Sequence, residues 1–212
     1  MFGCMNQRHP LRHLALLTQL LDAHAPQPEP TLYAPHPYGF LLAVLLSARC
    51  FDSRVNQVIP TLLELADSPE GMVGLEIEEI RQVIRPCGLS RQKAKAIWLL
   101  SEQLIRFHNG TVPATRSALE ALPGVGRKTA SVVLSQCFGV SAFPVDTHVF
   151  RCARRWQLSS ARSRERVERD LMAFFPEKLW VKTHLQMIAV GRKICRSRGH
   201  DGVACPFCRH FS

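Results

Sequence analysis

Apolar residues recur at three- and four-residue spacing along almost the whole chain of 212 residues, and this spacing constrains the fold more than any other feature. Leu14, Leu17 and Leu21 mark one such helical face. No segment alternates polar and apolar residues as a half-buried strand would. The sequence therefore predicts an all-α protein of about ten helices, near residues 10–23, 38–48, 52–65, 69–75, 77–85, 90–108, 115–121, 127–138, 147–156, 163–174 and 178–191.

Residues that typically start or interrupt helices support these assignments. Ser68, followed by Pro69 and Glu70, predicts a helix start, because serine caps unpaired N–H groups and proline fits the first turn. Residues 25–37 include five prolines and cannot form a regular helix. We expect this stretch to connect an N-terminal helix to the rest of the chain.

The net charge of +10 is unevenly distributed. Residues 1–110 hold ten Lys/Arg and ten Asp/Glu, whereas residues 111–212 hold seventeen and seven. A one-sided basic surface is typical of polyanion binders, although it also fits a merely solvated face. No apolar run approaches the ~20 residues that cross a bilayer, and no signal pattern opens the chain. We therefore expect an intracellular protein without a membrane partner.

Two expected helices, residues 115–121 and 127–138, are joined by only five residues: Leu122, Pro123, Gly124, Val125 and Gly126. This is a helix-hairpin-helix pattern. The glycines let the backbone turn tightly and approach another surface, and the N–H groups that start the second helix suit a phosphate. Taken alone, the pattern could also be a simple helix connection.

Chemistry-bearing residues follow the hairpin. Arg127 and Lys128 come next, and Asp146 follows eighteen positions after Lys128. The run LPGVGRKTA at 122–130, followed by VDTHVFR at 145–151, resembles the endonuclease III family of helix-hairpin-helix (HhH-GPD) DNA glycosylases. The resemblance extends through LLSARCFD at 45–52 and GLSRQKA at 88–94 to the cysteine-bearing tail, so it covers nearly the whole chain.

The resemblance implies two helical domains with a DNA-binding cleft between them. Residues 30–140 would form a six-helix domain with the helix-hairpin-helix. Residues 1–29 and 141–212 would form a second helical domain with the cysteine-bearing C-terminal loop. We expect a monomer in the cytoplasm or nucleoid.

The resemblance also implies catalytic roles for Lys128 and Asp146 in a bifunctional DNA glycosylase and AP lyase of base excision repair. Lys128 would attack the sugar, form a Schiff base and cleave the strand 3′ to the abasic site by β-elimination. Its amine must be neutral to react, which the helix N-terminus and burial against an apolar inter-domain surface would favour. Asp146 would stay ionised and offset charge on the sugar, or accept the proton of the amine. The alternative roles are a phosphate contact for Lys128 and a helix N-cap for Asp146.

The partner implied is double-stranded DNA that contains a damaged base or an abasic site. The nucleotide must be flipped out of the duplex. Leu89 would be the apolar wedge, and Arg49 would enter the vacated stack where the family commonly has glutamine. Without the family, Leu89 would be an ordinary core leucine. The further DNA-binding residues expected are Leu122, Gly124, Val125, Gly126, Arg127, Thr129 and His148.

The substrate class follows from comparing branches of the family. A mismatch-specific adenine glycosylase would lack the lysine and carry a glutamate near Leu46–Arg49. The 8-oxoguanine branch has the lysine but generally lacks a C-terminal cysteine cluster. An oxidised pyrimidine is therefore the expected substrate. The alternatives are a monofunctional glycosylase and a non-catalytic helix-hairpin-helix DNA-binding protein.

Three of the eight cysteines, Cys195, Cys205 and Cys208, lie in the last eighteen residues and indicate metal chemistry. The family often ends in C-x6-C-x2-C-x5-C around a structural [4Fe-4S] cluster. Here nine residues separate the first two cysteines, two separate the next pair, and a fourth cysteine is absent before Ser212. A cluster would need His210, Cys4 or an outside ligand. Otherwise the loop would serve through its basic residues, Arg192, Lys193, Arg196 and Arg198.

Overall fold

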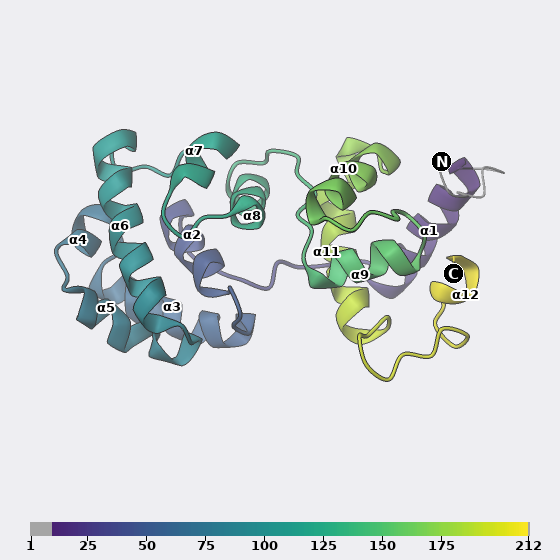
Figure 1. Cartoon of the computed structure of the whole chain (residues 1–212), viewed down its shortest axis with the longest axis horizontal. Helices are drawn as coiled ribbons and strands as arrows, with labels where there is room; N and C mark the ends of the chain where they lie inside the picture. Colours follow the sequence, from purple (N-terminus) through teal and green to yellow (C-terminus); the bar gives the residue numbers. More distant parts are fainter. Residues whose placement is uncertain (1–9, 212) are drawn as a thin grey trace. The chain divides into compact units, whose positions relative to one another are not determined.

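The computed structural model describes residues 10–211, which form twelve α-helices and two 3₁₀ helices and contain no strand (Figure 1). The all-α prediction is confirmed, and each expected range overlaps an observed helix. The helices are α1 (Pro10–His24), α2 (Pro37–Leu46), α3 (Asp52–Leu65), α4 (Pro69–Val73), α5 (Ile77–Ile84), η1 (Arg85–Cys87), α6 (Ser90–His108), α7 (Arg116–Ala121), α8 (Arg127–Cys137), α9 (Thr147–Arg155), α10 (Arg164–Phe174), η2 (Glu177–Leu179), α11 (Trp180–Lys193) and α12 (Cys208–Phe211).

The predicted cap of α4 and the predicted proline-rich connection are both present in the structure. Ser68 Oγ accepts a hydrogen bond from the Gly71 N–H at 3.2 Å and caps α4 as expected. The proline-rich stretch contains no regular helix between His24 and Pro37. Helix α12 was not expected, because its four residues are too few to show a helical period.

The chain divides into two compact units. We call Pro30–Val140 the hairpin unit, and the combination of Met1–Glu29 with Ser141–Ser212 the split unit. The hairpin unit, all of which is described, has seven α-helices and η1, whereas the resemblance implied a domain of six helices. The split unit contains the remaining helices of residues 10–211.

The hairpin unit is built around α2, which is buried from Tyr38 to Leu46 because its sequence is apolar on every side. Helices α3, α6 and α8 contact it, and α6 also runs along α4 and α5 (Figure 1). The one polar side chain tip in α2, the Tyr38 hydroxyl, is paired with Ser101 Oγ at 2.7 Å. The hairpin between α7 and α8 therefore rests on a fully apolar helix.

The split unit joins segments from both ends of the chain. Gln186 Nε2 of α11 donates to Asp22 Oδ1 at 2.7 Å and to the Ala25 carbonyl at 3.0 Å, which holds α1 against α11. Helix α9 contacts α11 as well. The C-terminal segment packs into the same core, where Phe207 stacks on Trp156 with ring centroids 4.6 Å apart.

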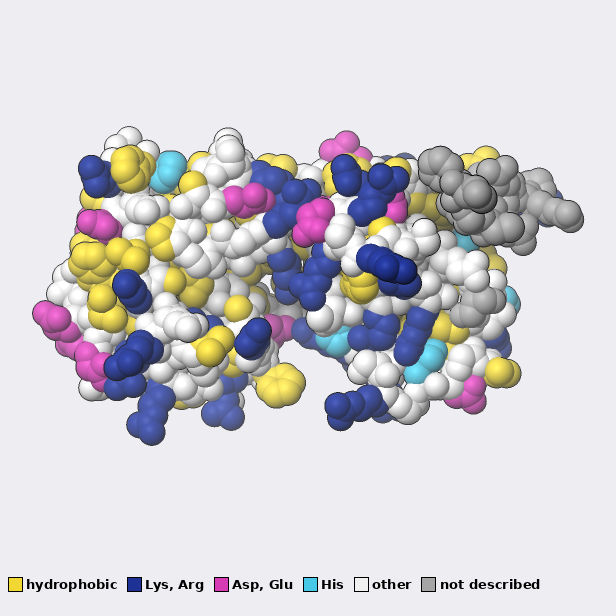
Figure 2. Space-filling model, viewed as in Figure 1, with side chains coloured by type: hydrophobic (Ala, Val, Ile, Leu, Met, Phe, Trp, Pro, Cys, Tyr) yellow, Lys and Arg dark blue, Asp and Glu magenta, His cyan; other side chains and the backbone are white. Residues whose placement is uncertain are grey.

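Most of the excess positive charge lies in the split unit. The split unit holds 16 Lys/Arg against 8 Asp/Glu, a net +8, whereas the hairpin unit holds 11 against 9, a net +2. Figure 2 shows Lys and Arg side chains at the surface of each unit. Among residues 10–211, no helix combines the length and hydrophobicity that a membrane span requires.

Candidate DNA-processing site and tail metal site

The hairpin between α7 and α8 is held from inside. The Val125 N–H donates to the Leu122 carbonyl at 3.1 Å, and both side chains are buried in the core of the hairpin unit. Gly124 has φ +77°, and a Cβ there would lie 3.0 Å from Leu45 Cδ1 and 3.0 Å from Ala96 Cβ. The backbone angle therefore favours glycine, and a Cβ would make two tight side-chain contacts. Leu122 and Val125 were both predicted to contact DNA. Because their side chains are buried, only their backbone groups can face a ligand.

The start of α8 is open. Gly126 is the N-cap residue, no side-chain cap covers the first turn, and a Cβ on Gly126 would meet nothing within 4 Å. The first N–H groups of a helix have no acceptor inside the helix, so an uncapped end of this kind suits an anion. Arg127 and Lys128 are exposed beside it, and Thr129 is half-buried.

Lys128 lies in the first turn of α8, as the sequence predicted. Its side chain is exposed, so its own unit does not supply the burial that we expected to favour a neutral amine. The helix N-terminus is present, because Lys128 is the second residue of α8. Arg116 fixes this helix to α7 by donating to Ser131 Oγ at 2.7 Å.

The start of α9 is closed by Asp146. Its Oδ1 accepts hydrogen bonds from the backbone N–H groups of His148 and Val149, both at 2.8 Å, and the residue is buried. The N-cap role considered for Asp146 is therefore confirmed. Both bonds end on Oδ1, so the cap does not need Oδ2. The two hydrogen bonds to Oδ1 fix the orientation of the carboxylate, and the cap leaves Oδ2 available for another contact.

His148 is held by Arg151 of the same helix. An Arg151 terminal nitrogen lies 3.2 Å from His148 Nδ1 and 2.7 Å from the Gly191 carbonyl, and Arg151 Nε donates to the Cys195 carbonyl at 3.1 Å. A guanidinium only donates, so Nδ1 accepts and the ring proton sits on Nε2. His148 thus offers an N–H donor from its other nitrogen.

Arg49 and Leu89 lie in strained backbone. Arg49 has φ +57° and Leu89 has φ +50°, the left-handed region that side chains larger than glycine rarely adopt. Arg49 is exposed, and 48% of Leu89 is exposed at the N-cap of α6. The reading of Leu89 as a core leucine is therefore wrong. Strain of this kind gathers at binding and catalytic loops.

Lys93 joins the two loops that carry these residues, and the sequence reasoning missed it. Its Nζ donates to the Leu46 carbonyl at 2.8 Å, where α2 ends before Arg49, and to the Cys87 carbonyl at 3.0 Å, in η1 before Leu89. Only 6% of Lys93 is exposed, and burial lowers the pKa of its ammonium. A lysine on the same helical face as Ile97 was the available signal.

Phe51 is a second residue that the sequence reasoning missed. It begins α3 in the loop after Arg49, and 84% of its side chain is exposed. Its four-residue spacing to Val55 is the spacing of a core residue, so no sequence signal marked it as exposed. An exposed aromatic ring next to Arg49 is suited to stacking on a base.

The three predicted tail cysteines come together in the split unit. The sulfurs of Cys195, Cys205 and Cys208 and one ring nitrogen of His200 all lie within 4.8 Å of one another, so the four residues could hold a metal. The fourth member is His200 and not His210, whose Nε2 lies 3.3 Å from Arg209 Nε. Cys4 lies outside the described residues. The signal was a histidine midway between Cys195 and Cys205, in the pattern C-x4-H-x4-C-x2-C.

The sequence matches known DNA-repair proteins over most of its length. A family model described as HhH-GPD superfamily base excision DNA repair protein matches residues 42–177. The chain is 40% identical to endonuclease III of Escherichia coli strain K12 over 187 residues, 88% of each protein. It is 41% identical to endonuclease III of Bacillus subtilis strain 168 over 184 residues, 85% of this chain and 83% of the relative.

Solved structures agree. A trapped endonuclease III–DNA covalent intermediate matches with a TM-score of 0.87 and 40% identity, over 93% of this chain and 94% of the other. A non-covalent endonuclease III–DNA complex matches with the same TM-score, identity and coverage. A thermostable thymine-DNA glycosylase, 22% identical with a TM-score of 0.82, shares the fold. The chain therefore belongs to the endonuclease III family of the HhH-GPD superfamily of base excision DNA repair proteins.

Proposed function

We propose that this protein removes oxidised pyrimidines from double-stranded DNA and cleaves the strand at the resulting abasic site, with Lys128 as the nucleophile. Its family membership makes it a DNA glycosylase with AP lyase activity. The observation that carries the assignment to Lys128 is its position: an exposed amine in the uncapped first turn of α8, behind a hairpin that Leu122 and Val125 hold to the core.

DNA is the partner, and the hairpin is our proposed contact for its backbone. The endonuclease III structures that match this chain include complexes with DNA, one of them covalent. The open N–H groups at Gly126 and Arg127 suit a phosphate, because the positive end of a helix and its unpaired donors favour an anion. The net +8 of the split unit would add non-specific attraction to the duplex.

The reaction that we assign to Lys128 has two stages. Neutral Nζ attacks C1′ of the sugar, the bond from C1′ to the base breaks, and the base leaves with its electron pair and takes up a proton. The sugar ring then opens as C1′ and Nζ form an imine. Loss of a proton from C2′ breaks the C3′–O bond by β-elimination, and the 3′ phosphate is the leaving group. Water finally releases Lys128.

Asp146 is our proposed carboxylate for this reaction. Positive charge develops on the sugar as the base leaves, and an ionised carboxylate stabilises it. The same group could accept the proton that the attacking amine loses. Its Oδ1 is committed to the α9 cap, so Oδ2 is the oxygen that we assign to this work. The cap holds the carboxylate without a further positioning residue.

A flipped nucleotide leaves a gap in the base stack of the duplex. We propose that Arg49 and Leu89 fill this gap. Both are exposed and both lie in left-handed backbone, and Lys93 bonds the segments that precede them. Leu89 would wedge between bases, while Arg49 would donate hydrogen bonds to the unpaired base. With arginine in place of the family's common glutamine, we expect a distinct opposite-base preference.

The choice of oxidised pyrimidines rests on Lys128, on the absence of a glutamate at Leu46–Arg49, and on the tail cysteines. We propose that the protein acts as a monomer on chromosomal DNA in the cytoplasm or nucleoid. A panel of duplexes with single lesions tests the substrate class. Release of thymine glycol at a rate well above that of 8-oxoguanine supports it, and the reverse order contradicts it.

Borohydride trapping tests the nucleophile. Purified protein is incubated with an abasic-site duplex and borohydride, which reduces an imine to a stable adduct. We expect a protein–DNA adduct that Lys128→Ala abolishes and that Arg127→Ala, the adjacent basic control, retains. An adduct that survives Lys128→Ala contradicts the assignment. Base release without strand cleavage would indicate the monofunctional glycosylase, and binding without either reaction would indicate a non-catalytic module.

A further inference from the structure

We infer that the C-terminal loop binds one tetrahedral Zn²⁺ through Cys195, His200, Cys205 and Cys208, in place of a four-cysteine [4Fe-4S] cluster. The three cysteines are buried and His200 is half-buried. They converge from the end of α11, the following loop and the start of α12. The inference concerns the split unit alone and does not depend on the catalytic residues.

The distances between ligand atoms fit a single ion. Zn–S bonds of ~2.3 Å and Zn–N bonds of ~2.0 Å in a tetrahedron place two sulfurs ~3.8 Å apart and a sulfur and a nitrogen ~3.6 Å apart. In this chain the Cys195 and Cys208 sulfurs are 3.8 Å apart, and His200 Nε2 is 3.2 Å from the Cys208 sulfur. The remaining pairs are all within 4.8 Å.

The same distances do not fit a cubane cluster. Each thiolate of a [4Fe-4S] cluster binds a different iron on the outside of the cube, so the ligand sulfurs stand roughly 6 Å apart. The four ligand atoms here lie within 4.8 Å, too close to surround such a group. The donor set agrees, because the cluster is normally held by four thiolates and this group has three thiolates and an imidazole.

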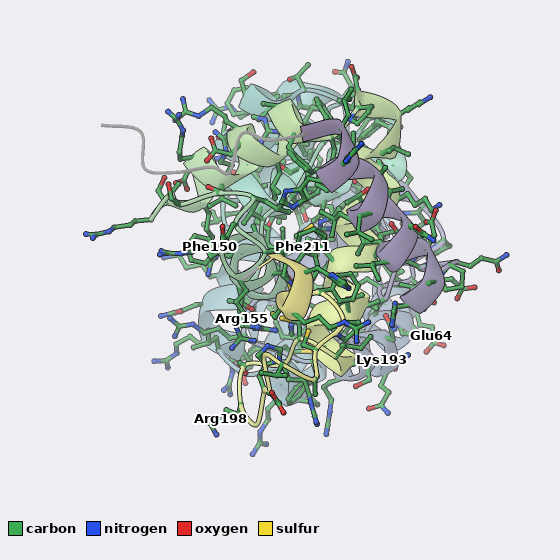
Figure 3. All side chains as sticks on the ribbon, turned by 90° about the vertical axis from the view of Figure 1, so that its right-hand side faces the viewer. Glu64, Phe150, Arg155, Lys193, Arg198 and Phe211 are labelled. Atoms are coloured by element: carbon green, nitrogen blue, oxygen red, sulfur yellow. The ribbon has the colours of Figure 1, made fainter. Side chains whose placement is uncertain are left out.

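Three thiolates and one imidazole form a closed structural zinc set. Groups around the ligands are arranged to hold it. One terminal nitrogen of Arg155 lies 3.5 Å from the Cys195 sulfur and donates to the Arg196 carbonyl at 2.8 Å. Figure 3 labels Arg155. Asp201 Oδ1 accepts from the Val203 N–H at 2.8 Å and shapes the turn before Cys205.

The ion would fix the loop to the core of the split unit. Phe207 lies between two of the ligands in sequence and stacks on Trp156, and Phe211 stacks on His13 with ring centroids 4.4 Å apart. Arg151 bonds the Cys195 carbonyl to α9. The loop of twelve residues from Arg196 to Phe207 contributes only Cys205 and Phe207 to the core. Without the ion, only the buried cysteines and the short helix α12 would hold this loop in place.

Metal analysis of the full-length protein tests the inference. The protein is expressed in medium that contains both zinc and iron, then purified anaerobically without chelator. We expect one zinc per chain, neither iron nor acid-labile sulfide, and no visible absorption. Iron with sulfide and a brown colour overturns the inference, as does a protein that contains no metal. Removal of the zinc by a chelator should lower the melting temperature, and zinc should restore it.

Variants test the ligand set through the spectrum of Co²⁺, which replaces zinc in the zinc-free protein. We expect tetrahedral Co²⁺ bands with thiolate charge transfer. His200→Ala should weaken Co²⁺ binding by more than about 100-fold, because even an outer partner of a ligand is worth 10- to 100-fold. The matched control, His210→Ala, should bind normally. Should His200→Ala misfold, His200→Cys decides: a fourth thiolate should raise the charge-transfer intensity by about a third. An unchanged spectrum in His200→Cys, or normal binding by His200→Ala, overturns the role of His200.

Discussion

Two helix starts in this protein solve the same backbone problem in opposite ways. Each leaves N–H groups without acceptors inside the helix. At α9, Asp146 accepts two of these hydrogen bonds, so the helix is closed by its own side chain. At α8, Gly126 provides no side chain, and the positive end of the helix stays open. The closed start stabilises the protein and holds a carboxylate, whereas the open start keeps the backbone donors that we propose for a DNA phosphate.

Four further helices, α3, α6, α7 and α11, also lack a side-chain hydrogen bond at the N-cap. Helices α3 and α6 start at Phe51 and Leu89, and neither has a side-chain cap. The same loops carry exposed residues to which we assign DNA contacts. In contrast, α4 and α10 begin with serine caps from Ser68 and Ser163. The uncapped starts of α3 and α6 thus coincide with loops to which we assign DNA contacts, whereas α7 and α11 are uncapped without such an assignment.

The largest effect is expected at the open start. Lys128→Arg keeps the positive charge beside the α8 N-terminus but has no nucleophilic amine. We expect the single-turnover rate of strand cleavage on abasic duplex to fall by at least about 10³-fold. Affinity for the same duplex should stay within about threefold of the wild type, measured by fluorescence anisotropy. A comparable loss of affinity would mean that Lys128 acts mainly by binding phosphate.

The closed start combines two roles, which substitution of Asp146 can separate. Asparagine keeps an Oδ1 acceptor for the N–H groups of His148 and Val149 but loses the charge. We expect Asp146→Asn and Asp146→Ala to lower base release and cleavage alike, by about 10²- to 10⁴-fold.

Stability should distinguish the two variants. Asp146→Ala should lose about 1 kcal/mol of unfolding free energy, and Asp146→Asn only a few tenths, because asparagine caps about as well as aspartate. Urea denaturation measures the difference. If Asp146→Asn keeps wild-type activity, the residue is only a cap and its catalytic role is wrong.

Sequence reasoning succeeded where the chemistry is local. The hairpin was readable because Gly124 and Gly126 lie between two helical patterns, and the Asp146 cap was readable because it precedes α9 directly. Lys93 was missed because its acceptors, the Leu46 and Cys87 carbonyls, are brought to it only by the packing of α2 and η1. A buried lysine becomes informative once its partners are known.

The tail shows the same limit. The three cysteines were found from their clustering, but the histidine expected to join them was His210 or none. His200 lies midway in the nine-residue loop between Cys195 and Cys205, and one of its ring nitrogens lies within 4.8 Å of the three sulfurs. The nine residues between Cys195 and Cys205 do not match the family's four-cysteine pattern, which has six. In the structure these residues include His200, the fourth ligand that we propose.

An intermediate effect is expected from closing the open start. Gly126 has φ −96° and ψ 176°, which is the extended backbone of a typical N-cap residue, and its Cβ position is empty. Gly126→Asp should therefore cap α8 as Asp146 caps α9, and raise the unfolding free energy by about 0.5 kcal/mol. The carboxylate would occupy the phosphate site, so DNA affinity should fall about tenfold. Gly126→Ala, which adds no acceptor, is the control and should cost less affinity.

The smallest effect is expected at the open start of α3. Phe51 is almost fully exposed, so Phe51→Ser should leave the melting temperature within about 1 °C of the wild type. Stacking of a base on an aromatic ring contributes about 1 to 3 kcal/mol, and we expect the lower value for a ring this exposed. We therefore expect about fivefold weaker binding to abasic duplex and little change for intact duplex, compared in one anisotropy titration. Phe107, also exposed but in the last turn of α6, is the matched site, and Phe107→Ser should change neither affinity. Equal losses at both positions would show that exposed aromatic area, and not the loop beside Arg49, determines the effect.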